Sequence, residues 1–294
     1  MGSEPTPTPT PTPMTAPAPS RSDLATDQQY LRETQYKDPT NLNVRISLHA
    51  KYSRADEPWF PWLAARIDWP DPADVLEVGC GAGTLWANID PLVAHVRLTL
   101  TDLSEGMVDA ASEVTASLEH VELVEGRACD AQELPFADGT FDVVVANHML
   151  YHVPDADRAV AGFARVLRAG GALLAATNGP NHLSELRQMS RQAIGWSGLD
   201  YTDGRFGRSS GQAILSRAFD VVEWHDHPTT IEVTDPADVV AFILSSAAGQ
   251  VATAEQRGCL PEVVDEWFRR EGGCVSMTTE AGCFVARRPR RQQH

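Results

Sequence analysis

Three glycines stand at alternate positions directly after a short apolar run in this chain of 294 residues. Residues 75–78, Val-Leu-Glu-Val, lead into Gly79, Gly81 and Gly83. The run predicts a buried strand, and the glycines predict a tight turn where the backbone comes close to another group. Residues 84–88 can open a helix, whose first N–H groups have no partner within the helix. Together, the strand, the glycine turn and the helix start predict a binding site for a nucleotide-type ligand.

An acidic residue follows this turn at a distance of about twenty residues. Residues 96–101 predict a second strand, because polar and apolar side chains alternate there, and the strand ends in Asp102. A carboxylate at that position can accept hydrogen bonds from both hydroxyls of a ribose. The spacing suits a strand–helix–strand nucleotide-binding unit. We therefore expect Asp102 to bind ribose, although an ordinary acid at a strand end is the simpler alternative.

The acidic residue inside the first run carries a resemblance to a known family. Glu77 stands two residues before the first glycine, so the sequence reads E-x-G-x-G-x-G. This pattern resembles motif I of the class I S-adenosylmethionine (SAM)-dependent methyltransferases. A dinucleotide fold would instead place a third glycine where this chain has Thr84. The resemblance implies that Glu77 and the glycine turn hold SAM.

A second stretch, residues 130–146, extends the resemblance. In the family, an Asp at this point accepts a hydrogen bond from the adenine amine, and the next backbone N–H faces the ring. Asp130 and Ala131 occupy those positions. Leu103 and Met107 follow the ribose-binding candidate, and they either flank the adenine or belong to the core.

The resemblance also implies contacts to the methionine end of SAM. Asn147 follows the predicted fourth strand, residues 141–146, and fits such a contact. N-terminal helices of family members often close over SAM and the substrate. On the predicted N-terminal helix, Arg45 and His49 lie one turn apart and share a face. Arg45 either holds the carboxylate of SAM or is a surface charge.

Candidate catalytic residues come directly after the fourth strand. Ligands of open α/β sheets lie outside the carboxyl ends of the strands, so His148, Tyr151 and His152 should face the reaction centre. Because imidazole titrates near neutral pH, His152 and His148 can orient a nucleophile or take its proton. The alternative is that they are structural or only line the pocket. The sequence has no clear set of metal ligands, and methyl transfer from SAM requires no metal.

The order of the predicted elements gives the fold class. From residue 75 to residue 176 it is strand, helix, strand, helix, strand, strand, helix and strand. This order is typical of an α/β fold with a doubly wound, mostly parallel sheet. The resemblance implies seven strands, of which the last is antiparallel, together with N-terminal helices and a helical cap.

Further elements are predicted outside that region. Residues 27–53 predict a helix with a break near Pro39 and Asn41. Another helix is predicted over residues 261–269. Near the end of the chain, we expect a pair of strands, one over residues 274–278 and one over 282–286, joined by a turn.

Composition and element order divide the chain into six predicted parts. The first, rich in Pro and Thr, cannot bury a core and predicts a disordered tail, in which Met14 is an alternative start. An insertion at the ligand edge predicts a substrate cap, with Asp200, Tyr201, Asp203 and Phe206 available for contacts. The parts are a tail (1–22), a helical lid (23–70), a SAM-binding core (71–177), the substrate cap (178–210), a C-terminal completion of the sheet with inserted helices (211–288) and a basic tail (289–294).

Composition limits the partners and the compartment. A net charge of −16 argues against nucleic acid as the main partner. No apolar run approaches membrane-spanning length, and the start of the chain lacks the regions of a signal peptide. The five cysteines include no C-x-x-C pair, so neither a disulfide framework nor a zinc site is indicated. We expect a protein of the reducing cytoplasm, with no oligomer indicated.

These observations converge on a SAM-dependent methyltransferase acting on a small molecule, such as a secondary metabolite. The resemblance supplies the reaction, an in-line displacement that leaves S-adenosylhomocysteine (SAH). Oxygen, nitrogen, carbon and sulfur acceptors are all compatible with these residues, with or without a general base. Three alternatives stay open: a non-catalytic SAM-binding or regulatory protein, a nicotinamide-dependent oxidoreductase, and a scaffold that works through the Pro-rich tail.

Overall fold

The computed structural model describes residues 24–198 and 202–290. The predicted tail (1–22), Asp200, Tyr201 and the side chain of Asp203 lie outside this described part.

A seven-stranded sheet forms the centre of the molecule, in the order β3-β2-β1-β4-β5-β9-β6. Strands β1 to β5 run parallel, whereas β9 is antiparallel to both β5 and β6. The predicted fold class, a doubly wound and mostly parallel sheet with an antiparallel last strand, is confirmed. The strands are β1 (Ala73–Val78), β2 (Val96–Asp102), β3 (Val121–Ala128), β4 (Phe141–Asn147), β5 (Leu167–Asn178), β6 (Phe219–Asp226) and β9 (Ala281–Pro289).

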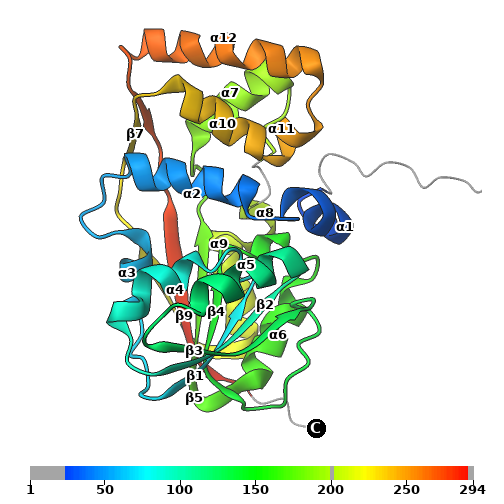
Figure 1. Ribbon diagram of the computed structural model, residues 1–294, viewed down its shortest axis with the longest axis vertical. Coiled ribbons are helices and arrows are strands. Elements are labelled where there is room, and N and C mark those ends of the chain that lie inside the picture. Colours follow the sequence, from blue (N-terminus) through cyan, green and yellow to red (C-terminus); the bar gives the residue numbers. More distant parts are fainter. Residues whose placement is uncertain (1–23, 199–201, 291–294) are drawn as a thin grey trace, which may run out of the picture.

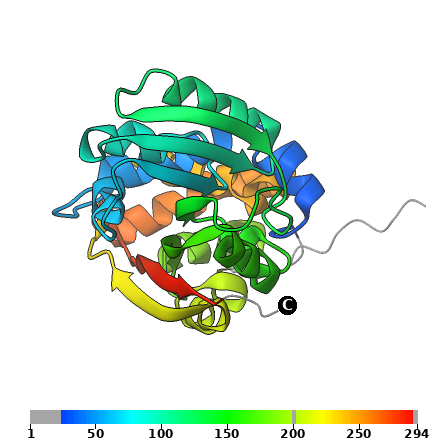
Figure 2. The same ribbon diagram turned by 90° about the horizontal axis from the view of Figure 1, so that it is seen from below.

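Helices cover both faces of this sheet, as the view from below shows (Figure 2). The central strands are apolar because both of their faces are buried, and no residue from Val75 to Val78 is more than 2% exposed. Trp86 belongs to the core on one face and Phe163 to the core on the other. The first face is covered by α3 (Trp59–Ala64), α4 (Thr84–Ile89) and α5 (Glu105–Thr115), and the second by α6 (Ala156–Val166) and α9 (Arg208–Ala218).

A separate helical layer lies beyond the carboxyl ends of the parallel strands (Figure 1). It has its own core, in which Leu186, Phe242 and Val264 are buried. Two short antiparallel strands, β7 (Ile231–Val233) and β8 (Val275–Met277), belong to it. Its helices are α7 (Ser184–Ile194), α10 (Pro236–Ser245), α11 (Ala247–Val251) and α12 (Ala254–Arg270). The layer therefore combines part of the predicted cap segment with later helices.

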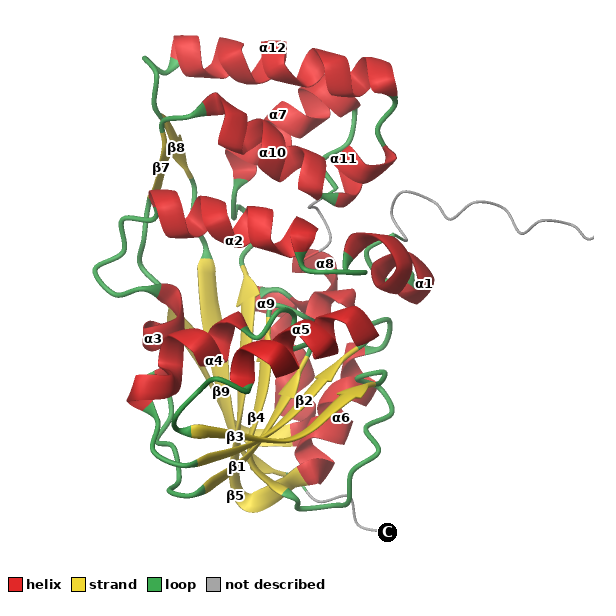
Figure 3. Ribbon diagram, in the orientation of Figure 1, coloured by secondary structure: helices red, strands yellow, loops and turns green. Residues whose placement is uncertain are grey.

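The N-terminal segment lies between the sheet and the helical layer (Figure 3). It contains α1 (Gln28–Tyr30), the π-helix η1 (Leu31–Gln35) and α2 (Thr40–Tyr52). The predicted break is confirmed, and Pro39 directly precedes α2, where a residue without an N–H fits a helix start. Asn41 lies inside α2 rather than at the break.

The predicted pairing of the last two strands is wrong. β8 pairs with β7 in the helical layer, whereas β9 inserts between β5 and β6. The physical reason is burial, because every residue from Gly282 to Ala286 is buried in the large sheet. A two-stranded hairpin could not cover so apolar a strand.

Two further expectations differ from the structure. Helix α12 begins at Ala254 rather than at residue 261, because Thr253 and Gln256 form a capping box and Pro261 is tolerated inside the helix. Phe206 ends the short helix α8 (Thr202–Phe206) and is fully buried beside Phe284. It belongs to the core and does not face the cavity.

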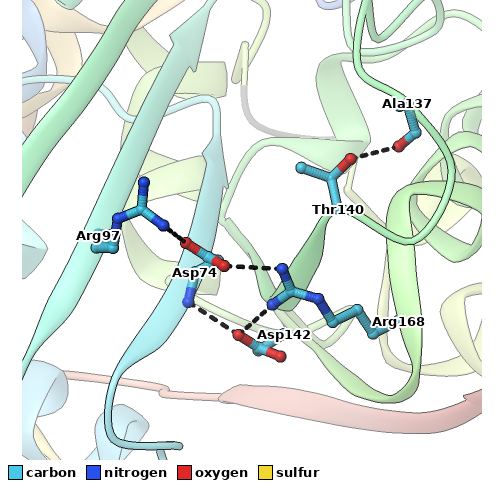
Figure 4. Close-up of polar contacts among 6 residues, drawn as sticks. All are labelled: Asp74, Arg97, Ala137, Thr140, Asp142 and Arg168. Carbon is cyan, nitrogen blue, oxygen red and sulfur yellow. Dashed lines mark hydrogen bonds and ion pairs between the residues drawn. The ribbon is translucent and has the colours of Figure 1, made fainter.

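Charged residues at the amino ends of the strands form one ion network (Figure 4). Asp74 accepts from Arg97 over 2.9 Å and from Arg168 over 2.8 Å. Arg168 also binds Asp142 over 2.5 Å. Asp142 in turn accepts a hydrogen bond from the backbone N–H of Asp74. The network ties the starts of β1, β2, β4 and β5 together.

Candidate functional site

A cavity of about 620 Å³ lies at the carboxyl ends of β1, β2, β4 and β5, beneath α2 and the helical layer. This volume lies within the range of about 300–1,000 Å³ that is common for small-molecule sites. All of the residues predicted to bind SAM or to act in catalysis line the cavity, except Gly83. Its lining also includes residues that the sequence did not single out.

The glycine turn has a left-handed backbone at all three glycines, with φ of 70° at Gly79, 52° at Gly81 and 72° at Gly83. A Cβ at Gly83 would lie 2.9 Å from the Cα of Ala111, so this glycine allows α5 to pack against the turn. A Cβ at Gly81 would lie 2.8 Å from the side chain of Leu42 on α2. Glycine is required here both for conformation and for close packing.

Asp102 ends β2 and faces this turn. One of its carboxylate oxygens accepts from the backbone N–H of Gly81 over 3.0 Å, and the other accepts from Ser104 over 2.9 Å. Burial raises the pKa of Asp102, while these backbone donors act in the opposite direction. Leu103 and Met107 lie just beyond it and also line the cavity.

Glu77 is 1% exposed and is tied to the helix that follows the turn. Its Oε2 accepts a hydrogen bond from the indole Nε1 of Trp86 over 2.6 Å. Burial raises the pKa of Glu77 to about 8, although the Trp86 donor acts to lower it. The carboxyl group is therefore largely protonated at neutral pH, and its visible contact is structural.

Asp130 already has a partner from the N-terminal segment. The side-chain amide of Gln28 donates to its Oδ2 over 2.7 Å, and the N–H of Gln132 donates to its Oδ1 over 2.9 Å. Burial alone would raise the pKa of Asp130, but these donors lower it overall. Ala131 is buried next to it. Sequence reasoning missed Gln28, because no pattern links α1 to the third strand.

Asn147 and Arg45 both line the cavity, the first at the end of β4 and the second on α2. The Oδ1 atom of Asn147 is buried and has no hydrogen-bond partner among the described residues. An amide oxygen left in this state fits an ammonium group as a ligand. Arg45 lies on α2, and its guanidinium carbon is 5.2 Å from the ring centroid of Tyr36.

His152 is held by the N-terminal segment through both ring nitrogens. Its Nδ1 must donate to the backbone carbonyl of Ala25, 2.8 Å away, because a carbonyl only accepts. Its Nε2 then accepts from the hydroxyl of Tyr36 over 2.9 Å. Burial lowers the pKa of His152 to about 4. Sequence reasoning found His152 but not Tyr36, its partner in the lid.

His148 stands at the end of β4 with an unusual backbone, φ of 56°. Only a few per cent of non-glycine residues adopt such a conformation, and it is often found at functional sites. Its ring centroid is 5.0 Å from that of Trp59. Burial lowers the pKa of His148 to about 3. The imidazole is therefore neutral at physiological pH.

Further side chains that sequence analysis did not propose complete the lining. The rings of His49 and His182 are stacked, with centroids 5.9 Å apart. His227 lies against Trp59, with centroids 5.2 Å apart. Asn178 ends β5 and has a buried Oδ1 without a hydrogen-bond partner in the described structure. Its position after a predicted strand, like that of Asn147, was the signal that could have identified it.

Among the residues that the structure describes, no group of three or more histidine, cysteine or acidic side chains is arranged to hold a metal ion. No helix in residues 24–198 or 202–290 combines the length and the apolar character needed to cross a membrane.

Comparisons with known proteins agree with this geometry. A family model described as a methyltransferase domain matches residues 76–175. The malonyl-[acyl-carrier protein] O-methyltransferase of Geobacter sulfurreducens is 33% identical over 68% of this chain and 75% of its own length. The demethylmenaquinone methyltransferase of Staphylococcus aureus is 37% identical over 39% of this chain, and the match covers 46% of that relative's length.

Solved structures support the fold. The [4+2]-cyclase SpnF aligns with a TM-score of 0.55 at 16% identity, over 92% of this chain and 97% of its own. The YcgJ protein of Bacillus subtilis aligns with a TM-score of 0.53 at 19% identity, over 80% of this chain and 98% of its own. At such identities the likeness concerns the fold alone. The relatives, the matched domain and the site together establish that the chain belongs to the SAM-dependent methyltransferases, with SAM as its cofactor.

Proposed function

We propose that this enzyme transfers the methyl group of SAM to a small molecule bound in the same cavity, leaving SAH. The observation that carries the proposal is the continuity of the cavity. Its lining runs from the glycine turn and Asp102, past Asn147, to His148 and Asn178 under the helical layer. One continuous cavity can therefore hold cofactor and substrate together. The named substrates of the two relatives, a malonyl-carrier protein and a demethylmenaquinone, support an acceptor that is a small group or molecule.

The proposed SAM contacts are the residues predicted from the sequence. Asp102 would bind the ribose hydroxyls, Asp130 and the N–H of Ala131 the adenine edge, and Leu103 and Met107 its faces. Glu77 would act mainly through the glycine turn, which it supports by fixing Trp86. When bound, SAM supplies an electrophilic methyl carbon on a sulfonium, and the protein has to align the nucleophile with it in a dry cleft.

Asn147 and Arg45 would bind the methionine end. The unpartnered oxygen of Asn147 suits the ammonium group, and the Arg45 guanidinium suits the carboxylate. Gly79 and Gly81 would let the backbone approach this end closely, while Gly83 supports them by packing on α5.

We propose that His152 and His148 act at the substrate side in different ways. Both ring nitrogens of His152 already form hydrogen bonds, so His152 would act on the substrate only through the hydroxyl of Tyr36, which donates to its Nε2. These bonds and the Gln28–Asp130 bond also hold the N-terminal lid over the cavity. His148 faces the cavity beside Trp59 and would contact the acceptor itself.

We also propose that the parts predicted from the sequence have separate roles. SAM would bind to the core (71–177), and the substrate would be covered by the lid (23–70) and the cap (178–210). The C-terminal part (211–288) would complete the sheet, and its helices α10 to α12 would add to the cap. The charge of −16 supports a small-molecule partner over nucleic acid. The five free cysteines, of which Cys259 and Cys274 are exposed, suit the reducing cytoplasm.

The test is calorimetric titration of SAM and SAH into the native protein and into Asp102→Ala. A charge-assisted hydrogen-bond pair contributes roughly 1.5–3 kcal/mol, so affinity should fall about ten- to a hundredfold. The matched control is Asp109→Ala, which removes an exposed acid from α5 and should leave affinity unchanged. Native protein that binds neither ligand, or an Asp102→Ala variant that binds as tightly, would contradict the proposed site.

A further inference from the structure

One part of the cavity carries four histidines. We call it the histidine chamber. It is formed by side chains from α2, the end of β4, the loop after β5 and the loop between β6 and β7. Its aromatic walls are Trp59 of α3 and Phe242 of α10. The chamber consists of His49, Trp59, His148, Asn178, His182, His227 and Phe242.

Carboxylates are confined to the other part of the cavity. Among the described lining residues they are Glu77, Asp102 and Asp130, at the ends of β1 and β2 and just after β3. Around the chamber, burial lowers the pKa of His182 well below its usual value, and the charge of Arg187 on α7 adds a smaller effect in the same direction. The carboxylate of Glu280, outside the lining, is bound by the N–H and side-chain amide of Asn181. A cationic substrate would therefore find no counter-ion in the described lining of the chamber.

The chamber offers hydrogen-bond donors at defined positions. The backbone N–H of Glu280 donates to Nδ1 of His182 over 3.2 Å. A neutral imidazole that accepts at Nδ1 carries its proton on Nε2, so His182 is a donor on that side. Asn178 also lines the chamber, and its amide NH₂ group can donate hydrogen bonds to a ligand there. Donors of this kind suit an oxygen anion.

The imidazoles of His49 and His148 are poor proton acceptors. Burial lowers the pKa of His49 to about 4 and that of His148 to about 3. In each case the nearby imidazoles add to the effect, His227 for the first and His49 for the second. A phenolic hydroxyl has a pKa of about 10, so proton transfer to either ring would be uphill by about six units or more. A hydroxyl acceptor of this kind would therefore have to be ionised before transfer.

We propose that the histidine chamber binds an organic acid with a flat apolar body and presents its carboxylate oxygen for methylation. This inference rests on the proposed methyltransferase function. In the reaction, the bond between the carboxylate oxygen and the methyl carbon forms as the carbon–sulfur bond breaks. The electron pair of that bond goes to sulfur. The products are a methyl ester and SAH, and no proton is transferred.

The test uses three probes of one shape, benzoate, benzamide and benzylamine, titrated into the full-length protein with SAH bound. They are anionic, neutral and cationic at pH 7. We expect benzoate to bind at least tenfold more tightly than either of the others. Incubation with methyl-labelled SAM should then transfer the label to benzoate as its methyl ester. Equal or tighter binding of benzamide or benzylamine would overturn the proposal.

Two variants locate the preference in the chamber. His182→Asn keeps an acceptor for the Glu280 N–H but removes the Nε2 donor, and Asn178→Leu removes the amide at similar volume. Each variant should bind benzoate at least fivefold more weakly than the native protein and should show a smaller preference for benzoate over benzamide. The affinity for SAH should stay within twofold of the native value. His95→Asn is the control, because His95 is exposed and pairs with Asp71 away from the cavity.

The outcomes separate the two levels of inference. SAH binding without any benzoate binding, or a benzoate preference that both variants retain, would remove the organic-acid proposal and leave the methyltransferase function standing. Failure of SAH itself to bind would instead contradict the proposed function.

Discussion

The two ends of the same strands are built on opposite principles. At the amino ends, charged residues of β1, β2, β4 and β5 pair with one another in the network around Arg168 (Figure 4). At the carboxyl ends, the same β4 and β5 finish in Asn147 and Asn178, whose amide oxygens are buried without a hydrogen-bond partner among the described residues. A buried amide without a partner costs about 1–3 kcal/mol.

The difference shows where stability and function reside in this sheet. Beside the unpartnered amides, His148 holds a left-handed backbone. The lowered pKa values of His49, His148 and His152 keep these imidazoles neutral. Such features persist only where the surrounding structure determines them strongly. The paired amino end and the cores on both faces offset these costs. Experiments that change one end at a time can therefore test the comparison directly.

The largest expected effect is acid sensitivity caused by the carboxyl end. The folded-state pKa is about 4 for His49 and His152 and about 3 for His148, against 6.5 when unfolded. Between these values the unfolded chain binds protons that the folded chain does not, so stability is lost as pH falls from about 6.5 toward 4. Each imidazole contributes about 1.4 kcal/mol per pH unit. Glu77 has the opposite effect. Because its pKa is raised to about 8, the folded chain binds about one proton more at this site than the unfolded chain does over this pH range.

Burial also lowers the pKa of His182 well below 6.5, which adds one more proton to the difference. We therefore expect the free energy of unfolding to fall by about 4 kcal/mol per pH unit between pH 6 and pH 5. Urea denaturation across this range measures the slope. His148→Asn should lower the slope by about 1.4 kcal/mol per pH unit, since Asn tolerates a positive φ. The exposed His95 provides the control, His95→Asn, which should leave the slope unchanged. If the free energy of unfolding of the native protein did not change across this pH range, the inference that these rings are neutral in the folded protein would be wrong.

The second effect comes from the glycine turn. Gly83→Ala adds a Cβ 2.9 Å from the Cα of Ala111 at a φ of 72°. Left-handed strain and overpacking together should lower the free energy of unfolding by about 2–4 kcal/mol, and SAM affinity should fall with it because the turn shifts. In contrast, Gly162→Ala lies inside α6 with nothing within 4 Å of the new Cβ. It should raise stability by about 0.5–1 kcal/mol. Equal effects of the two variants would refute the packing role of Gly83.

The sheet and the cofactor end of the site could be predicted because their signals are local. A strand, a glycine turn and a helix follow one another directly from Val75 to Ile89, and an acid at the end of the next strand must reach the same edge. Parallel strands place all their carboxyl ends together. The order of elements was therefore enough to place Asp102 and Asn147 near the glycine turn.

The substrate end could not be predicted in the same way. Tyr36 and Gln28 reach the site through the packing of the lid, and His182 through a loop whose sequence has no period. The pairing of β8 with β7 joins segments more than forty residues apart. Such contacts are decided by tertiary packing rather than by local propensity. Apart from His148 and His152, which were predicted because they follow β4, only Asn178 could have been identified, since it comes shortly after a predicted strand.

The third effect concerns the amino end alone. Arg168→Gln removes two ion pairs at once, to Asp74 and to Asp142. Because these groups are partly exposed, the free energy of unfolding should fall by only about 1–2 kcal/mol, and by less in high salt. SAM affinity should stay within twofold. The control Arg217→Gln breaks a single, more exposed pair with Asp157 and should cost less than about 0.5 kcal/mol. A large loss of SAM binding in Arg168→Gln would contradict the separation of the two ends.

The smallest expected effect on stability distinguishes two neighbouring residues of β5, Thr177 and Asn178. Thr177 is fully buried, and its hydroxyl donates to the carbonyl of Phe206 over 2.5 Å, so Thr177→Val should lower the free energy of unfolding by about 1–2 kcal/mol. Asn178→Leu removes an amide whose oxygen is buried without a hydrogen-bond partner in the described structure. Its stability should therefore be unchanged or up to about 1 kcal/mol higher, measured by the same urea denaturation. A clear loss of stability in Asn178→Leu would mean that this amide supports the fold, and that the carboxyl end is not kept polar for a ligand.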